Sequence, residues 1–127
     1  MASIILDASA LLAYVKSEVG AEVVAGVIGD AAISAVNFSE AVSKLVGWGA
    51  SLDAARAALS VATIDVIDFD RELAEQAGAL AARTKRFGVS LGDRACLALA
   101  ARDGLPVLTG DRAWSKLGLD IDIRFIR

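Results

Sequence analysis

The stretch SLGDRACLALAARDGLPVLTGDRAW, residues 90–114, decides the fold of this chain. Its first part has the composition of a buried helix that a glycine closes, and LPVLT (105–109) has that of a short buried strand, with the proline at its start, where it is tolerated. The tripeptide Gly-Asp-Arg occurs twice, once at the start of the helix and once directly after the strand. In a parallel sheet, the end of one strand and the start of a neighbouring helix can lie at the same edge. Asp93 and Asp111 are therefore expected at the same end of the sheet.

The same alternation of short apolar runs with helical patterns extends over the whole chain. It predicts an α/β fold with a mostly parallel central sheet flanked by helices, built as a single domain over residues 1–127. Strands are expected at 3–6, 31–35, 64–69, 105–109 and 121–126, the last at an edge of the sheet. Helices are expected at 9–18, 21–30, 37–48, 52–62, 70–85, 91–104 and 111–118.

The composition is unusually apolar, with 56% hydrophobic residues and a mean hydropathy of +0.57. No uncharged apolar run reaches the roughly 20 residues that cross a bilayer. The N-terminus has no basic leader, and Asp7 interrupts its apolar stretch, so we expect a cytoplasmic protein without a signal peptide. The apolar surplus fits either a sheet buried on both faces or a surface that binds a partner or a second copy.

Several catalytic classes are excluded because the chain has no histidine and a single cysteine. Serine and cysteine triads, histidine bases and the usual zinc sites are therefore absent. Cys96 lies in an apolar run and is expected to be a buried small residue. Carboxylates, with or without a metal ion, would have to carry any catalysis.

The net charge of −3 gives weak evidence against a nucleic-acid partner, but the charge is unevenly distributed. Residues 1–82 hold 4 basic and 11 acidic residues, whereas residues 83–127 hold 9 basic and 5 acidic ones. The basic C-terminal third is either an ordinary solvated surface or a source of phosphate contacts.

Four acidic residues fall where the predicted strands end or where the adjoining helices begin: Asp7, Glu40, Asp93 and Asp111. Each has an ordinary alternative role at a helix N-terminus, and Asn37 with Glu40 and Ser90 with Asp93 have the spacing of a capping box. Four carboxylates at one edge of a sheet repel each other, however, and a divalent cation removes that cost. Oxygen ligands suit Mg²⁺ or Mn²⁺, so the pattern indicates metal-assisted attack of water on phosphorus.

The segments that carry these acids resemble those of PIN-domain ribonucleases, and specifically the VapC toxins of type II toxin–antitoxin systems. The similar segments are IILDASALLAYV (4–15), ISAVNFSEAVSKL (33–45), VSLGDRACLALAARDGLPVLTGDRAW (89–114) and IDIRFIR (121–127), in the right order over nearly the whole chain. The resemblance implies a PIN-like three-layer fold and a metal-dependent endoribonuclease. It also implies a cognate VapB-type antitoxin and a homodimer.

The same resemblance implies a role for each acid. Asp7, Asp93 and Asp111 would hold one or two Mg²⁺ ions, which Mn²⁺ can replace. Glu40 would position or deprotonate the attacking water, or bind a second ion. Three neighbours, Ser9, Asn37 and Thr109, would orient carboxylates or water or have only structural roles. Two arginines, Arg94 and Arg112, would pair with acids or contact phosphate, with pairing the slightly favoured role. Gly92 and Gly110 would let the backbone approach the site closely.

Other interpretations of the sequence remain open at this point. A phosphoryl-accepting receiver domain needs paired acids after the first strand and a lysine after the last, and here Asp7 stands alone. A haloacid-dehalogenase-like phosphatase needs a second aspartate where Ser9 stands. A non-catalytic α/β binding or dimerisation module is the third alternative. Leu45, Val46 and Trp48 are either a partner groove or ordinary core residues.

Overall fold

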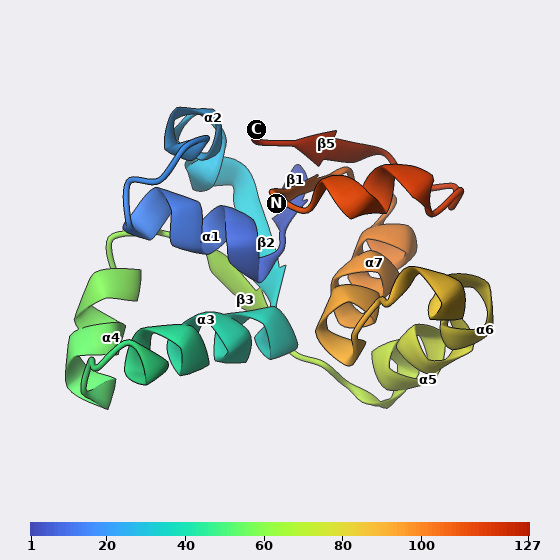
Figure 1. Ribbon diagram of the computed structural model, residues 1–127, viewed down its shortest axis with the longest axis horizontal. Helices are drawn as coiled ribbons and strands as arrows, with labels where there is room; N and C mark the ends of the chain where they lie inside the picture. The colour runs from blue at the N-terminus through green and yellow to red at the C-terminus, as the bar shows by residue number, and fades with distance from the viewer.

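The computed structural model describes residues 1–127 and has a five-stranded central sheet between two groups of helices (Figure 1). The strands are β1 (Ile4–Leu6), β2 (Ala31–Ser34), β3 (Asp65–Ile67), β4 (Val107–Thr109) and β5 (Ile123–Phe125). Their spatial order is β3-β2-β1-β4-β5, and all four pairings are parallel. The predicted α/β class is confirmed, and the sheet is entirely rather than mostly parallel.

Helices connect successive strands and cover both faces of the sheet. The α-helices are α1 (Ala8–Val15), α2 (Ala21–Ala25), α3 (Ala35–Gly47), α4 (Leu52–Leu59), α5 (Arg71–Ala79), α6 (Ala81–Thr84) and α7 (Leu91–Asp103). Three 3₁₀ turns complete the connections: η1 (Ile28–Asp30), η2 (Lys85–Phe87) and η3 (Arg112–Lys116). In Figure 1, α1 to α4 lie on one side of the sheet and α5 to α7 on the other.

Alternate strand residues supply the two cores. Ile5, Ala32 and Val107 pack in one cluster with residues of α5, α7 and η3. Leu6 and Leu108 point the other way and pack in a cluster with residues of α1 and α2. The three inner strands are buried along their whole length, which explains the apolar composition, because a parallel sheet covered on both faces requires it.

Five of the predicted helices differ from the observed ones. The first helix begins at Ala8, one residue before the predicted start, with Asp7 as its N-cap, and α3 begins at Ala35 with Ser34 as its N-cap, two residues before the predicted start. The predicted helix at 21–30 divides into α2 and η1, and the one at 70–85 divides into α5, α6 and η2. The predicted helix after Asp111 is the 3₁₀ turn η3. The edge position of the last strand is confirmed by β5.

None of the helices is both long enough and apolar enough to cross a membrane.

Candidate functional site

Asp7 lies at the end of the central strand β1 and is 6% exposed, so its carboxylate is among the few buried charged groups. One carboxylate oxygen accepts a hydrogen bond from the Ser9 hydroxyl (2.7 Å) and another from the Ala10 backbone N–H (2.9 Å). The other oxygen accepts from the Thr109 hydroxyl at 2.5 Å. Because β1 and β4 are neighbours in the sheet, their ends place Asp7 and Thr109 together although they are 102 residues apart.

Burial raises the pKa of Asp7 above its ordinary value of 3.8, because the ionised carboxylate loses its water there. The hydrogen bonds from Thr109, Ser9 and Ala10 act in the opposite direction, and the nearby negative charge of Asp93 raises the pKa further. The site thus holds a carboxylate at an energetic cost, which a bound cation would remove.

Glu40 lies in α3 and is held by Asn37, which is one turn earlier on the same helix. The Asn37 amide donates to Glu40 Oε1 (2.8 Å) and to the Gly92 carbonyl at the start of α7 (2.9 Å). Asn37 is therefore not half of a capping box, which was one of its two expected roles. Its amide instead orients the Glu40 carboxylate, which was the other, and joins α3 to α7. Gly92 packs directly under the Glu40 carboxylate, since a Cβ at this position would lie 2.6 Å from Glu40 Cδ and Oε2.

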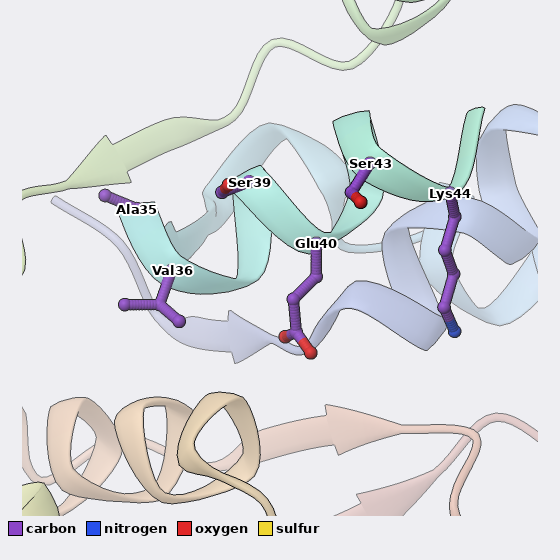
Figure 2. Close-up of a pocket in the computed structure, with 6 residues that line it drawn as sticks. All are labelled: Ala35, Val36, Ser39, Glu40, Ser43 and Lys44. Atoms are coloured by element: carbon purple, nitrogen blue, oxygen red, sulfur yellow. The ribbon is translucent and has the colours of Figure 1, made fainter. Parts of the chain in front are cut away.

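A cavity of about 630 Å³ opens beside Glu40 along α3. Figure 2 shows Glu40 and Lys44 projecting from the same side of the helix. Lys44 was not among the predicted site residues, although it follows Glu40 by four residues and such residues share a helix face. The cavity is lined by Ala35, Val36, Ser39, Glu40, Ser43 and Lys44.

Asp93 occupies the first turn of α7, where the predicted capping box with Ser90 is confirmed. The Asp93 N–H donates to the Ser90 hydroxyl (3.2 Å), and the Ser90 N–H donates to the Asp93 carboxylate (3.0 Å).

Burial raises the pKa of Cys96 well above 9.0, and the charges of Asp7, Asp93 and Glu40 raise it further. The charges of three of the four predicted acids therefore raise the pKa of one buried thiol.

Asp111 is connected to Asp7 through Thr109. The Asp111 N–H donates to the Thr109 hydroxyl oxygen (3.0 Å), the same hydroxyl that donates to Asp7. The Asp111 side chain itself is exposed and accepts a hydrogen bond from the Ala113 N–H (3.0 Å), which caps η3. The carboxylate thus lies at the rim, while its backbone belongs to the buried network.

The four carboxylates do not yet form a ligand set, because no three acidic side chains lie close enough together to hold one metal ion. Each accepts at least one hydrogen bond from a donor of its own segment, and mutual repulsion favours this separation. The donor chemistry still fits a hard cation, since all the available groups are oxygens. In addition, the Asn37 side-chain oxygen is buried without a hydrogen-bond partner, and a water or cation could satisfy it.

The arginines that follow Asp93 and Asp111 do not pair with acids. The Arg94 guanidinium donates to the Ala77 carbonyl (3.1 Å). That of Arg112 lies 4.5 Å from the centroid of the Phe125 ring and donates to the Arg127 carbonyl oxygen (3.5 Å). The favoured interpretation as ion pairs with carboxylates is therefore wrong for both.

The glycines of the two Gly-Asp-Arg sequences do permit close approach. At Gly92 the Glu40 carboxylate occupies the place of a Cβ, and at Gly110 the Arg127 guanidinium does so, 2.9 Å from such an atom. Neither glycine has a positive φ. The contacts therefore depend on the absence of a side chain and not on backbone freedom.

The three residues predicted as a partner groove lie in different environments: one is buried and two are exposed. Leu45 is 9% exposed and packs in the core between α1, α3 and α4, so it is not part of a groove. Val46 and Trp48 are 45% and 57% exposed at the end of α3. The Lys16 ammonium lies 3.5 Å from the centroid of the Trp48 ring, a cation–π contact that holds this ring on the surface.

The fold and the site together define an α/β protein with acidic side chains gathered at the carboxyl edge of a parallel sheet. The sequence model of the PIN domain matches residues 4–119. The chain belongs to the PIN domain family. No curated protein matches it by sequence.

Solved structures with the same fold come from several bacteria. The toxin–antitoxin complex VapBC of Salmonella typhimurium, in its DNA-bound form, has a chain that matches with 24% identity and a TM-score of 0.73, over 100% of both chains. VapC20 of Mycobacterium tuberculosis, a toxin that cleaves the sarcin–ricin loop, matches with 20% identity and a TM-score of 0.71, over 92% of this chain and 96% of that one. VapBC-1 of nontypeable Haemophilus influenzae matches with 15% identity and a TM-score of 0.72, over 97% of each chain.

Proposed function

We propose that the chain is a VapC-type toxin: a metal-dependent endoribonuclease of a type II toxin–antitoxin pair. The observation that carries the proposal is the buried Asp7 carboxylate at the end of the central strand, whose pKa is raised by burial and by the charge of Asp93. A buried, costly carboxylate is typical of a functional site. Membership of the PIN domain family and the nuclease activity of the similar VapC20 support the same conclusion.

We assign Asp7, Asp93 and Asp111 as the residues that would hold Mg²⁺, with Mn²⁺ as a substitute. When bound, the cation would supply charge neutralisation for the phosphate and for the three carboxylates. Ser9 and Thr109 keep Asp7 oriented through hydrogen bonds to its two separate oxygens. Together with the Ala10 N–H they leave one acceptor position free, on the oxygen that accepts from Thr109.

Glu40 is the residue that would receive the proton of the attacking water. Its carboxylate is fixed by Asn37 and borders the open cavity, so it has both a defined position and access to solvent. As the water oxygen forms its bond to phosphorus, a phosphodiester P–O bond breaks and the leaving oxygen takes up a proton. Lys44 lines the same cavity and would face the negative charge that develops on the phosphate.

The partners of this proposal are RNA as substrate, a VapB-type antitoxin and a second copy of the chain. The antitoxin is supported by the VapBC complexes among the similar structures. The exposed Val46 and Trp48 are the residues we assign to a protein partner. We further propose that residues 1–127 fold as one domain.

The test compares the wild type with Asp7→Asn, both purified without any partner. Each is incubated with total tRNA and with ribosomal RNA, in Mg²⁺, in Mn²⁺ and in EDTA. Cleavage by the wild type alone, abolished by EDTA, is the expected result. Equal cleavage by both proteins would indicate a contaminant. No cleavage by a folded wild type whose melting temperature Mn²⁺ does not raise would refute the proposal and favour a non-catalytic module.

A further inference from the structure

A cleft of about 870 Å³ lies between the α6–η2 segment and the turn that follows η3. Its lining includes four basic side chains, Arg83, Lys85, Arg86 and Lys116, and no acidic one. This composition is unusual in a chain whose net charge is −3. All four basic residues are exposed, so their charged ends face solvent.

Apolar anchors hold the two walls of this cleft in place. Phe87 of η2 packs against the same buried cluster that contains Trp114 and Leu117 at the other wall. Thr84 is fully buried, and its hydroxyl donates to the Leu80 carbonyl (2.8 Å), which fixes the end of α6. The basic side chains thus project from a shared rigid base rather than from a loose loop.

None of these four cations is neutralised by an acid of the chain. The four ion pairs in the structure involve other basic residues, namely Arg56, Arg71, Arg102 and Arg124. Four like charges around one cleft repel each other, and a polyanion relieves that repulsion. Lysine and arginine without acidic neighbours are the residues that bind phosphates along a nucleic acid.

The two basic walls adjoin the acidic segments along the chain. The η2 wall leads through Gly88 and Val89 to the Ser90–Asp93 capping box. At the other wall, Lys116 is the last residue of η3, the turn that begins directly after Asp111.

We propose that this cleft binds the phosphodiester backbone of RNA outside the carboxylate site. The proposal rests on the nuclease function proposed above, because that function makes RNA the polyanion that the chain must hold. The cleft offers charge but little stacking surface, since the Phe87 ring beside it is covered by the guanidinium of Arg86, 4.9 Å from its centroid. Binding there is expected to be independent of base sequence.

The experiment measures the affinity for a fluorescein-labelled 20-nucleotide polyuridylate RNA by anisotropy, in EDTA, over a range of salt concentrations. The cleft variants are Lys85→Gln with Lys116→Gln and, separately, Arg83→Gln with Arg86→Gln. The control, Arg56→Gln with Arg124→Gln, removes the same charge from arginines that are paired with acids elsewhere. Melting temperatures check that all the variants are folded.

Each lost phosphate contact on a single strand lowers the slope of log affinity against log salt by about 0.7. Each cleft variant is therefore expected to bind about tenfold more weakly at about 150 mM salt, with a slope shallower by about 1.4. The control is expected to bind like the wild type. In cleavage of tRNA, the cleft variants should raise KM and leave kcat unchanged.

Suppose that the wild type binds and cleaves RNA, and that both cleft variants have the same affinity and the same salt dependence as the wild type. That result would overturn the proposal for the cleft and leave the proposed function standing. That outcome would leave the cleft to an acidic protein partner. A wild type that neither binds nor cleaves RNA would overturn the proposed function, and this proposal with it.

Discussion

Substituting Gly92 by alanine tests whether the carboxylate of Glu40 must occupy its observed position. The new Cβ would lie 2.6 Å from both Cδ and Oε2 of Glu40, far inside van der Waals contact, so the carboxylate has to move. The move breaks the hydrogen bond from Asn37 (2.8 Å), which is worth about 1.5–3 kcal/mol for a charged acceptor. Replacing a helical glycine by alanine returns about 0.5–1 kcal/mol.

The expected stability loss of Gly92→Ala is therefore small, about 1–2 kcal/mol, and the protein stays folded. The loss of activity is expected to be much larger. A positioned general base contributes about 10²–10⁴-fold to a rate, so we expect RNA cleavage to fall by about 100-fold or more. The dissociation between a modest loss of stability and a large loss of rate is the signature of a displaced catalytic carboxylate.

Gly78→Ala is the matched control, because Gly78 lies within α5 and a Cβ there meets no atom within 4 Å. This variant should gain about 0.5–1 kcal/mol and cleave like the wild type. The assay combines urea unfolding with initial rates on tRNA, in the wild type and in a Glu40→Gln background. Because Gly92→Ala acts through Glu40, it should have no further effect in that background. Full activity of Gly92→Ala, or the same loss on top of Glu40→Gln, would refute the reasoning.

Asp7→Asn is expected to raise the melting temperature at pH 7 without metal. Burial raises the pKa of Asp7, so the folded state binds the proton more tightly than the unfolded chain does. The free energy of unfolding of the wild type therefore falls as the pH rises from 3.8 through the pKa of the folded state. Urea unfolding from pH 3 to 8 checks this, and a variant that melts below the wild type at pH 7 would contradict it. Thr109→Val removes the largest contact that lowers the Asp7 pKa, so the acid limb of the pH–rate profile should move to higher pH, and no movement would argue against the role of that hydroxyl. Leu73→Ala empties a position that is 1% exposed between α5 and α7 and should cost about 2–5 kcal/mol in urea unfolding, whereas Leu52→Ala, at 50% exposed, should change stability by less than about 0.5 kcal/mol. Cys96 is fully buried with a raised pKa, so Ellman's reagent should label it only after denaturation, and rapid labelling of the folded chain would show that α7 opens.

Much of the fold could be predicted from the sequence because its signals are local. Short apolar runs that end in a polar residue mark β1 and β4, and the helical patterns between the runs require parallel connections. The break between α5 and α6 could not be predicted, because nothing at Leu80 forbids a helix. Leu80 keeps right-handed helical backbone angles, and Thr84 bonds to the Leu80 carbonyl through both its N–H and its hydroxyl.

The candidate site was predictable in its acids but not in its connections. The spacing of Asp7, Asp93 and Asp111 relative to the strands is a local property of the sequence. The bond from Asn37 to the Gly92 carbonyl joins residues 55 positions apart, so its local spacing to Glu40 suggested a helix cap instead. The binding of a cation by Asp7, Asp93 and Asp111 stays a prediction. The three carboxylates lie too far apart to hold one ion, so a bound metal would have to draw them together.

The long-range bond between Asp7 and Thr109 has a consequence for the chain during its synthesis on the ribosome. The first strand is made almost at once, but its partner β4, which supplies Thr109, is made only after a hundred further residues. A nascent chain that stops before β4 lacks the hydroxyl that orients Asp7 and also lacks Asp111. If the chain is the nuclease proposed above, every incomplete copy would therefore lack activity.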